Sequence, residues 1–194
     1  MEFPLVAGIV FVAVIIGLAF WAYERFVNTQ LAIVPDVSNS ARFPAVRGSS
    51  LSKRDYVFPG DIEGRVALLM IAFQQIQQIE VNTWLPAARV LAEQHADFSY
   101  YELPTIQRLT APARAFIDGG MRAGIPDQTA RDTTITLYLD KGAFRRALKI
   151  PTEDSITVML VDPKGAVFWR AQGPATEQLE SDLEAAVNQA LAIK

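Results

Sequence analysis

Cysteine is absent from this sequence of 194 residues, and histidine occurs only once, as His95. Without cysteine the chain forms no disulfide, no thiolate nucleophile, no Cys-ligated zinc site and no iron–sulfur cluster. A single histidine disfavours a His-rich metal site and most His-based acid–base schemes. His95 stands near the end of a predicted helix, where a polar residue caps carbonyl groups. We therefore expect no metal site and no cofactor.

An excess of charge of either sign is also missing. Lys and Arg number 18 against 21 Asp and Glu, which leaves a net charge of −3. Because nucleic acid is bound through a basic surface, we expect no nucleic-acid partner. The hydrophobic share of 51% is typical of a folded chain and too high for a disordered one.

Charge is wholly absent between Phe3 and Tyr23. A helix of about 21 residues spans roughly 31 Å, enough to cross the hydrocarbon core of a bilayer. A secretory signal peptide is the alternative, but it needs a positively charged start and a cleavage site flanked by small residues. Arg25, Arg42 and Arg47 follow the segment and no basic residue precedes it. The positive-inside rule therefore places the following domain on the matrix or cytoplasmic side.

The remaining chain divides into two parts by pattern. Residues 26–60 contain many turn residues and read as a tether that begins to dock near Phe43, whereas residues 61–194 alternate strands and helices. Expected strands are 65–73, 97–103, 133–139, 156–161 and 166–171, the last two joined by a turn at 162–165. Expected helices are 76–96 with a kink or restart at Pro86, 111–118 stopped by two glycines, 142–148 and 176–192. This βαβαβαββα order predicts a thioredoxin-like α/β fold: a mixed sheet with helices on both faces.

The residues from about 42 to 190 also resemble the thioredoxin-like mitochondrial ATP synthase assembly factor family, a divergent relative of the peroxiredoxin-like proteins. The resemblance is carried by Phe43-Pro44, Gly48 to Leu51, Gly64, Trp84, Tyr101 to Pro104, Met121 to Ile125, Arg131, Leu160 to Asp162, Gly165, Trp169-Arg170, Gly173 and Glu177. The apolar segment at 3–23 departs from a cleavable mitochondrial presequence, which is rich in Arg and Ser. The resemblance therefore leaves two alternatives, that the chain is a bacterial homologue or that it is a subunit of another complex.

The chemistry of redox thioredoxins is missing at both of its positions. A Cys-x-x-Cys pair follows the first strand of the unit in those proteins, and here that stretch is Gln74 to Gln78. The proline expected just before a later strand is replaced by Ile156, and Pro151 is too far upstream. We therefore predict a protein without redox activity. The glutamine amides either hold a partner's backbone or form a solvated helix start.

Other candidate sites are also interpreted structurally. The glycine-rich segment 118–125 lacks the spacing of a phosphate-binding P-loop. Glu102 and Asp162 form no evident acid–base pair, and Asp162 suits a turn. Trp84 and Trp169 suit a core or an interface. We predict no catalytic residues and no enzyme.

A partner surface is expected instead in the insert between the second and third predicted strands, together with the tether. Its residues are Phe43, Met121, Arg122, Ile125 and Arg131, because exposed apolar side chains beside arginine are typical of interfaces. The alternative is that Met121 and Ile125 fill the domain's own core and that the two arginines pair internally.

The resemblance implies a membrane-anchored binding protein that assists assembly of the ATP synthase membrane sector. The rival hypothesis is a permanent accessory or scaffold subunit of a respiratory, photosynthetic or ATP synthase complex. In both cases the partners are membrane-complex subunits, with residues 1–25 as the transmembrane helix in the lipid bilayer. The expected location is an energy-transducing membrane, either the mitochondrial inner membrane or a bacterial plasma membrane.

Overall fold

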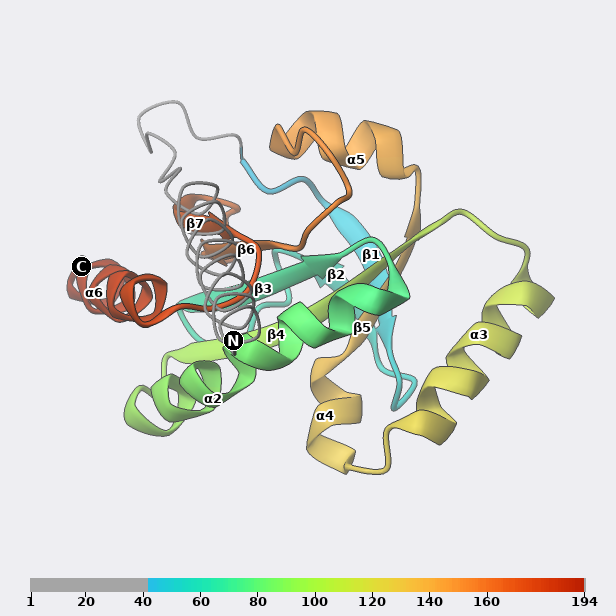
Figure 1. Ribbon diagram of the computed structural model, residues 1–194, viewed down its shortest axis with the longest axis horizontal. Helices are drawn as coiled ribbons and strands as arrows, with labels where there is room; N and C mark the ends of the chain where they lie inside the picture. Colours follow the sequence, from blue (N-terminus) through green and yellow to red (C-terminus); the bar gives the residue numbers. More distant parts are fainter. Residues whose placement is uncertain (1–41, 194) are drawn as a thin grey trace, which may run out of the picture. The chain divides into compact units, whose positions relative to one another are not determined.

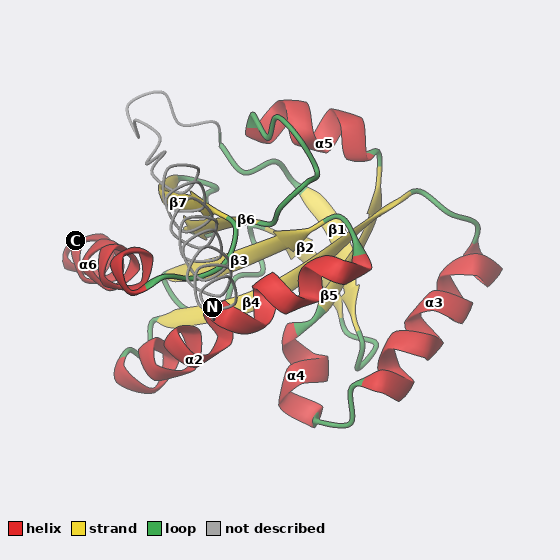
Figure 2. Ribbon diagram, in the orientation of Figure 1, coloured by secondary structure: helices red, strands yellow, loops and turns green. Residues whose placement is uncertain are grey.

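The computed structural model describes residues 42–193. Seven strands and the helices that cover them are shown in Figure 1 and Figure 2. The strands are β1 (Val46–Ser50), β2 (Asp55–Phe58), β3 (Val66–Ala72), β4 (Phe98–Gln107), β5 (Ile135–Leu139), β6 (Thr157–Val161) and β7 (Val167–Gln172). The helices are the short 3-10 turn η2 (Gln75–Gln77), α2 (Gln78–Gln94), α3 (Ala111–Gly124), α4 (Gln128–Thr133), α5 (Lys141–Leu148) and α6 (Glu177–Ala192).

The strands form one sheet in the order β2-β1-β5-β4-β3-β6-β7. β3, β4 and β5 are parallel, as the predicted crossover helices require, and the β6–β7 hairpin is antiparallel at one edge. The turn of that hairpin is closed by Gly165, whose N–H donates to the Asp162 carbonyl at 2.9 Å. The element order predicted from residue 61 onward is confirmed apart from one additional helix, α4, and the mixed sheet is confirmed as well.

Two apolar clusters lie on opposite faces of the sheet. β3 is buried along its whole length, because alternate side chains point to the two faces and both are covered. One cluster packs β3 and β6 against α2 and α6, and the other packs them against α5. Trp84 and Trp169 meet edge to face at 5.8 Å in the first cluster, and Trp84 Nε1 donates to the Gly173 carbonyl at 2.9 Å. Both tryptophans are therefore core residues.

Two local expectations are wrong, those for β4 and α3, and one of the two alternatives at Pro86 is excluded. β4 does not end at Pro104. Its pairing with β3 stops at this residue and its pairing with β5 begins at the next, so the strand tolerates a proline that has no N–H to donate. α2 continues through Pro86 without a restart. α3 continues through Gly119 and Gly120 to Gly124, because an exposed glycine weakens a helix without ending it. α4 was not expected at all.

The segment expected to be a tether contributes two strands. β1 pairs antiparallel with β2 and with β5, so residues 46–58 belong to the sheet rather than to a linker. β1 shows no clear alternation of buried and exposed positions, and β2 alternates strictly but over only four residues, too short a run for the pattern to stand out.

The outer strand β2 is blocked on its free side. The Val57 N–H donates to the Asp61 carboxylate at 2.6 Å, and the Val57 carbonyl accepts from the Asp61 N–H at 3.1 Å. One residue thus occupies both outward backbone groups of Val57.

No helix within residues 42–193 has the length and apolar character needed to cross a bilayer. The apolar segment Phe3–Tyr23 lies outside the described residues.

Candidate functional site

The first candidate site is the chain reversal between β3 and α2, where a redox thioredoxin would carry its cysteines. Gln74 and Gln77 stand there with the i, i+3 spacing of that motif, Gln74 exposed and Gln77 only 2% exposed. The Gln77 side-chain oxygen accepts from the backbone N–H of Phe73 at 2.7 Å and of Gln74 at 3.2 Å. Gln77 therefore satisfies two backbone donors at the point where the strand turns into the helix.

Both glutamine amides also donate to a single backbone carbonyl of the facing loop. The Nε2 atoms of Gln74 and Gln77 lie 2.9 and 2.6 Å from the Glu153 carbonyl oxygen. Glu153 belongs to the loop between α5 and β6. The two amides thus hold a backbone carbonyl of the chain itself, whereas the sequence suggested the backbone of a partner. The solvated-helix interpretation is wrong for Gln77, which is buried.

The same loop is held by charge from α5. The Glu153 carboxylate forms ion pairs with Lys141 and Arg145, and the Arg145 guanidinium also donates to the Pro151 carbonyl. Lys141 Nζ lies 3.4 Å from the Phe73 carbonyl. Because these side chains are about three-quarters buried or more, their attraction is screened less than that of a surface pair.

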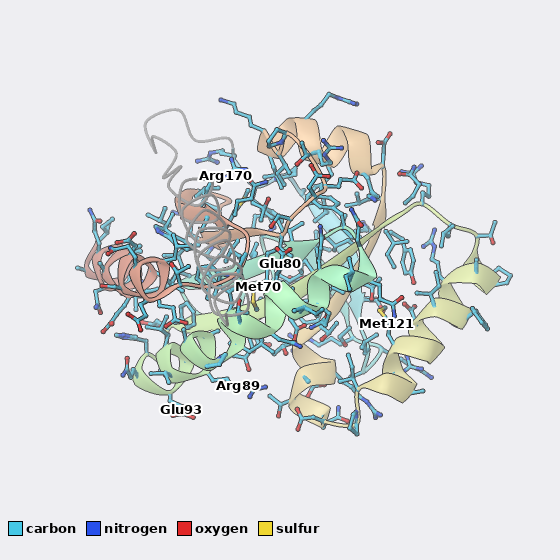
Figure 3. All side chains as sticks on the ribbon, in the orientation of Figure 1. Met70, Glu80, Arg89, Glu93, Met121 and Arg170 are labelled. Atoms are coloured by element: carbon cyan, nitrogen blue, oxygen red, sulfur yellow. The ribbon has the colours of Figure 1, made fainter. Side chains whose placement is uncertain are left out.

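Ile156 occupies the position at which a redox thioredoxin carries its second hallmark, the proline. Its N–H donates to Glu80 Oε2 at 3.1 Å, and its carbonyl accepts from the Gly173 N–H at 3.0 Å. The Ser155 hydroxyl donates to the same Glu80 oxygen at 2.5 Å. Figure 3 labels Glu80 near the start of α2. The N–H and the carbonyl of Ile156 are therefore both hydrogen-bonded within the chain, and neither is available to an extended peptide of a partner.

This arrangement has no group suited to thiol chemistry, because it contains no sulfur. Two of its carboxylates, Glu80 and Glu153, are engaged in the bonds that close the loop. No three His, Asp or Glu residues in the described range come together as metal ligands. His95 lies at the other end of α2, where its N–H caps the Leu91 carbonyl at 3.0 Å.

Four of the five predicted partner residues are brought together. Met121 and Arg122 lie in the last turn of α3, Ile125 follows it and Arg131 lies on α4, all half-buried. Arg122 Nε donates to the Leu51 carbonyl and Arg131 Nε to the Ile125 carbonyl, each at 2.6 Å. Both arginines thus bond internally, to carbonyls rather than carboxylates. Figure 3 shows Met121 on the side of α3 that faces the sheet.

Phe43, the fifth predicted partner residue, stands apart from this group. It is 3% exposed and meets Phe144 of α5 edge to face at 5.8 Å, within the second apolar cluster. The most exposed large apolar residue in the range 42–193 is Phe116 on α3, with 84% of its surface accessible, and it was not among the predicted partner residues. Also overlooked were Glu80 and Glu153, whose roles depend on contacts more than 70 residues away in the chain.

Comparison with known proteins identifies the fold. No family model and no curated protein matches the sequence. BsSco, described as a member of the Sco family of cytochrome c oxidase assembly proteins, matches with a TM-score of 0.55 and 13% identity over 80% of this chain and 96% of its own. A putative electron transfer protein from Aquifex aeolicus gives a TM-score of 0.53 at 10% identity, covering 79% and 98%. A DsbF homologue from Corynebacterium diphtheriae gives 0.51 at 16% identity, covering 81% and 91%.

At such identities the likeness concerns the fold alone, and it establishes that this chain has a thioredoxin-like fold. The thioredoxin domain of a thiol-disulfide oxidoreductase from Bacteroides vulgatus also matches, with a TM-score of 0.50 and 16% identity over 75% of this chain and 96% of its own. This chain has no cysteine with which to perform the reaction named for that protein.

Proposed function

We propose that this protein is a redox-inactive thioredoxin-like binding protein. The observation that carries the proposal is that Gln74 and Gln77 stand where the two cysteines would be, and that both amides donate to the Glu153 carbonyl. A position that would need a mobile, reactive thiol is here a fixed structural junction. With Ile156 occupied as well, the domain acts through its outer surfaces rather than through a catalytic centre.

In its finer form, the proposal is that the domain assists assembly of the ATP synthase membrane sector while anchored by residues 3–23. Support comes from the sequence resemblance over about residues 42–190 and from the length of the uncharged segment. BsSco is described as a cytochrome c oxidase assembly protein, so a domain of this fold can serve a membrane complex. Tethering to the same bilayer raises the local concentration of such a partner, and modest contacts then suffice.

The anchor is tested on membranes from the native source. Carbonate extraction should leave the protein in the pellet, and its intact mass should include residues 3–23. A protein released into the supernatant, or a mature chain that begins after Tyr23, would refute anchoring by this segment. The domain should be accessible to protease only from the matrix or cytoplasmic side.

Assembly factor and permanent subunit differ in stoichiometry. After gentle solubilisation and affinity capture, an assembly factor should co-purify with incomplete ATP synthase intermediates at a ratio below one and be absent from the finished complex. A constant ratio to the finished ATP synthase, or to another respiratory or photosynthetic complex, would favour the accessory subunit. Mass spectrometry of the captured material decides between them.

The partner surface is tested in the same capture experiment. Met121→Ser with Ile125→Ser should weaken capture. Because both side chains are half-buried, circular dichroism at the capture temperature should first show that the variant is folded. Val90→Ser is the control, because Val90 is a half-exposed apolar residue on α2, a different helix. Equal capture by both variants would exclude this part of the insert as the docking surface.

A further inference from the structure

A cleft of about 570 Å³ opens between α3 and the β1–β5 part of the sheet. The sheet contributes its floor through alternate residues of two neighbouring strands, which point to the same face. α3 contributes the outer wall, and it stands at the right-hand side of the molecule in Figure 1. The lining residues include Arg47, Ser49, Asp55, Arg108, Arg114, Asp118, Thr136 and Tyr138. A volume of this size is in the range of small-molecule sites.

The charge of the cleft is opposite in sign to that of the whole chain. Three arginines and two aspartates line it, a local net charge of +1, whereas the chain carries −3. Arg47 and Arg108 are exposed, and their guanidinium groups form no hydrogen bond or ion pair with any residue in the range 42–193. Arginines without a protein partner in a concave site are suited to bind an anion, because the guanidinium fork matches carboxylate and phosphate oxygens.

The wall and the floor are joined by a fixed contact. Tyr138 donates its hydroxyl to Asp118 Oδ1 at 2.7 Å, and the Arg114 guanidinium lies 5.3 Å from the centre of the Tyr138 ring. Burial and the bond to Asp118 raise the pKa of Tyr138, so the phenol remains a proton donor. Asp118 is therefore occupied by Tyr138, and Arg114 is held with its charge at the cleft.

Thr136 supplies an independent sign that the cleft is a binding site. It is 2% exposed, lines the cleft from β5, and its hydroxyl has no hydrogen-bond partner among the described residues. Leaving a buried hydroxyl without a partner is costly, and native proteins rarely do so. The hydroxyl oxygen is covered in the free protein, so a ligand oxygen would satisfy it once the side chains over it move aside.

We propose that the cleft between α3 and β5 binds a small soluble phosphate compound. Arg47 and Arg108 hold the phosphate oxygens with their free guanidinium groups, Arg114 adds charge from the wall, and the Thr136 hydroxyl donates to one oxygen. A phosphate presents enough acceptors for all of these donors at once, and it carries the charge that three arginines favour.

Pyrophosphate is the probe, used with the full-length chain in nonionic detergent at constant ionic strength. Saturable binding by calorimetry and a raised melting temperature are expected. Arg47→Gln with Arg108→Gln should weaken binding by about tenfold or more, because charge-assisted hydrogen bonds are lost. Arg146→Gln with Lys164→Gln is the matched control: it removes the same charge from exposed positions outside the cleft and should leave the affinity unchanged.

Thr136→Val separates a ligand contact from a structural role. Because the hydroxyl has no partner in the free protein, its removal should leave the melting temperature unchanged or raise it, while pyrophosphate affinity falls. Two results would overturn the proposal: no saturable binding at about 10 mM pyrophosphate, or equal loss of affinity in the control pair. Binding to phosphatidic acid vesicles that pyrophosphate fails to compete would likewise overturn it, in favour of a lipid headgroup.

Discussion

Gln77 is a buried amide that forms several hydrogen bonds to the backbone. It accepts two backbone N–H groups and donates to one carbonyl, so all but one of its four hydrogen-bonding positions are used. We expect Gln77→Ala to lower the free energy of unfolding by roughly 2 kcal/mol, because the buried Phe73 N–H would lose this partner, whereas the Glu153 carbonyl would keep the amide of Gln74. Urea denaturation measures this, with Gln75→Ala as the exposed control. An equally small effect of both substitutions would contradict the structural role of Gln77.

Glu102 is a buried carboxyl in the middle of the sheet, 5% exposed. Burial raises its pKa, while the 2.8 Å hydrogen bond from Gln78 and the charge of Arg89 partly lower it. The folded state then takes up a proton at a higher pH than the unfolded chain does. Stability therefore falls as pH rises from the ordinary glutamate pKa of 4.5 through the raised value.

We expect Glu102→Gln to stabilise the protein at neutral pH and to lose that advantage at a pH below 4.5. The measurement is denaturant unfolding of parent and variant across this pH range. Glu93→Gln is the control, since Glu93 is exposed on α2, and Figure 3 labels it toward the end of that helix. A stability difference that does not change with pH would disprove the link to ionisation.

At the scale of elements, α3 is the least integrated helix of the domain. None of its residues is buried, and added Cβ atoms at Gly119, Gly120 and Gly124 would meet nothing within 4 Å. We expect Gly119→Ala with Gly120→Ala to stabilise the helix by about 1 kcal/mol per substitution. The gain should appear as slower amide hydrogen exchange within α3.

Gly64→Ala provides the contrast for that experiment. Gly64 has φ of +83°, and an added Cβ would lie 2.5 Å from the Asp97 carbonyl oxygen, so this variant should be strongly destabilised. If α3 exchanged no more slowly in the double alanine variant, the helix would owe its order to contacts rather than to its own propensity.

The elements that could be predicted from the sequence are those with a strong local pattern. The apolar run of β3, the Pro and Gly of the 162–165 turn and the stripe of α6 each specify structure within a few residues. β1, β2 and α4 could not be predicted, because short partly exposed strands and a six-residue helix depend on their neighbours. The absence of redox chemistry could be predicted, because Gln74 to Gln78 stand where the cysteines would be. The hydrogen bonds that close this region could not be predicted, because they join residues far apart in the chain.

At the scale of the whole molecule, a thioredoxin-like fold here lacks the chemistry that many such folds perform. We expect the purified protein to reduce insulin and consume peroxide no faster than buffer, because thiolate attack is the required first step and the chain has no thiol. The assay should include a cysteine-containing thioredoxin as positive control. Turnover above the level without protein would show that another group performs the reaction.

The Asp61 contacts at β2 bear on how this domain can join larger assemblies. An exposed edge strand invites another chain to continue the sheet, which is a route to polymers as well as to complexes. Because Asp61 already engages the outward donor and acceptor of Val57, an incoming strand at β2 would first have to displace that carboxylate. Association at this end should therefore proceed through side chains, and the monomer should resist fibril growth from this edge.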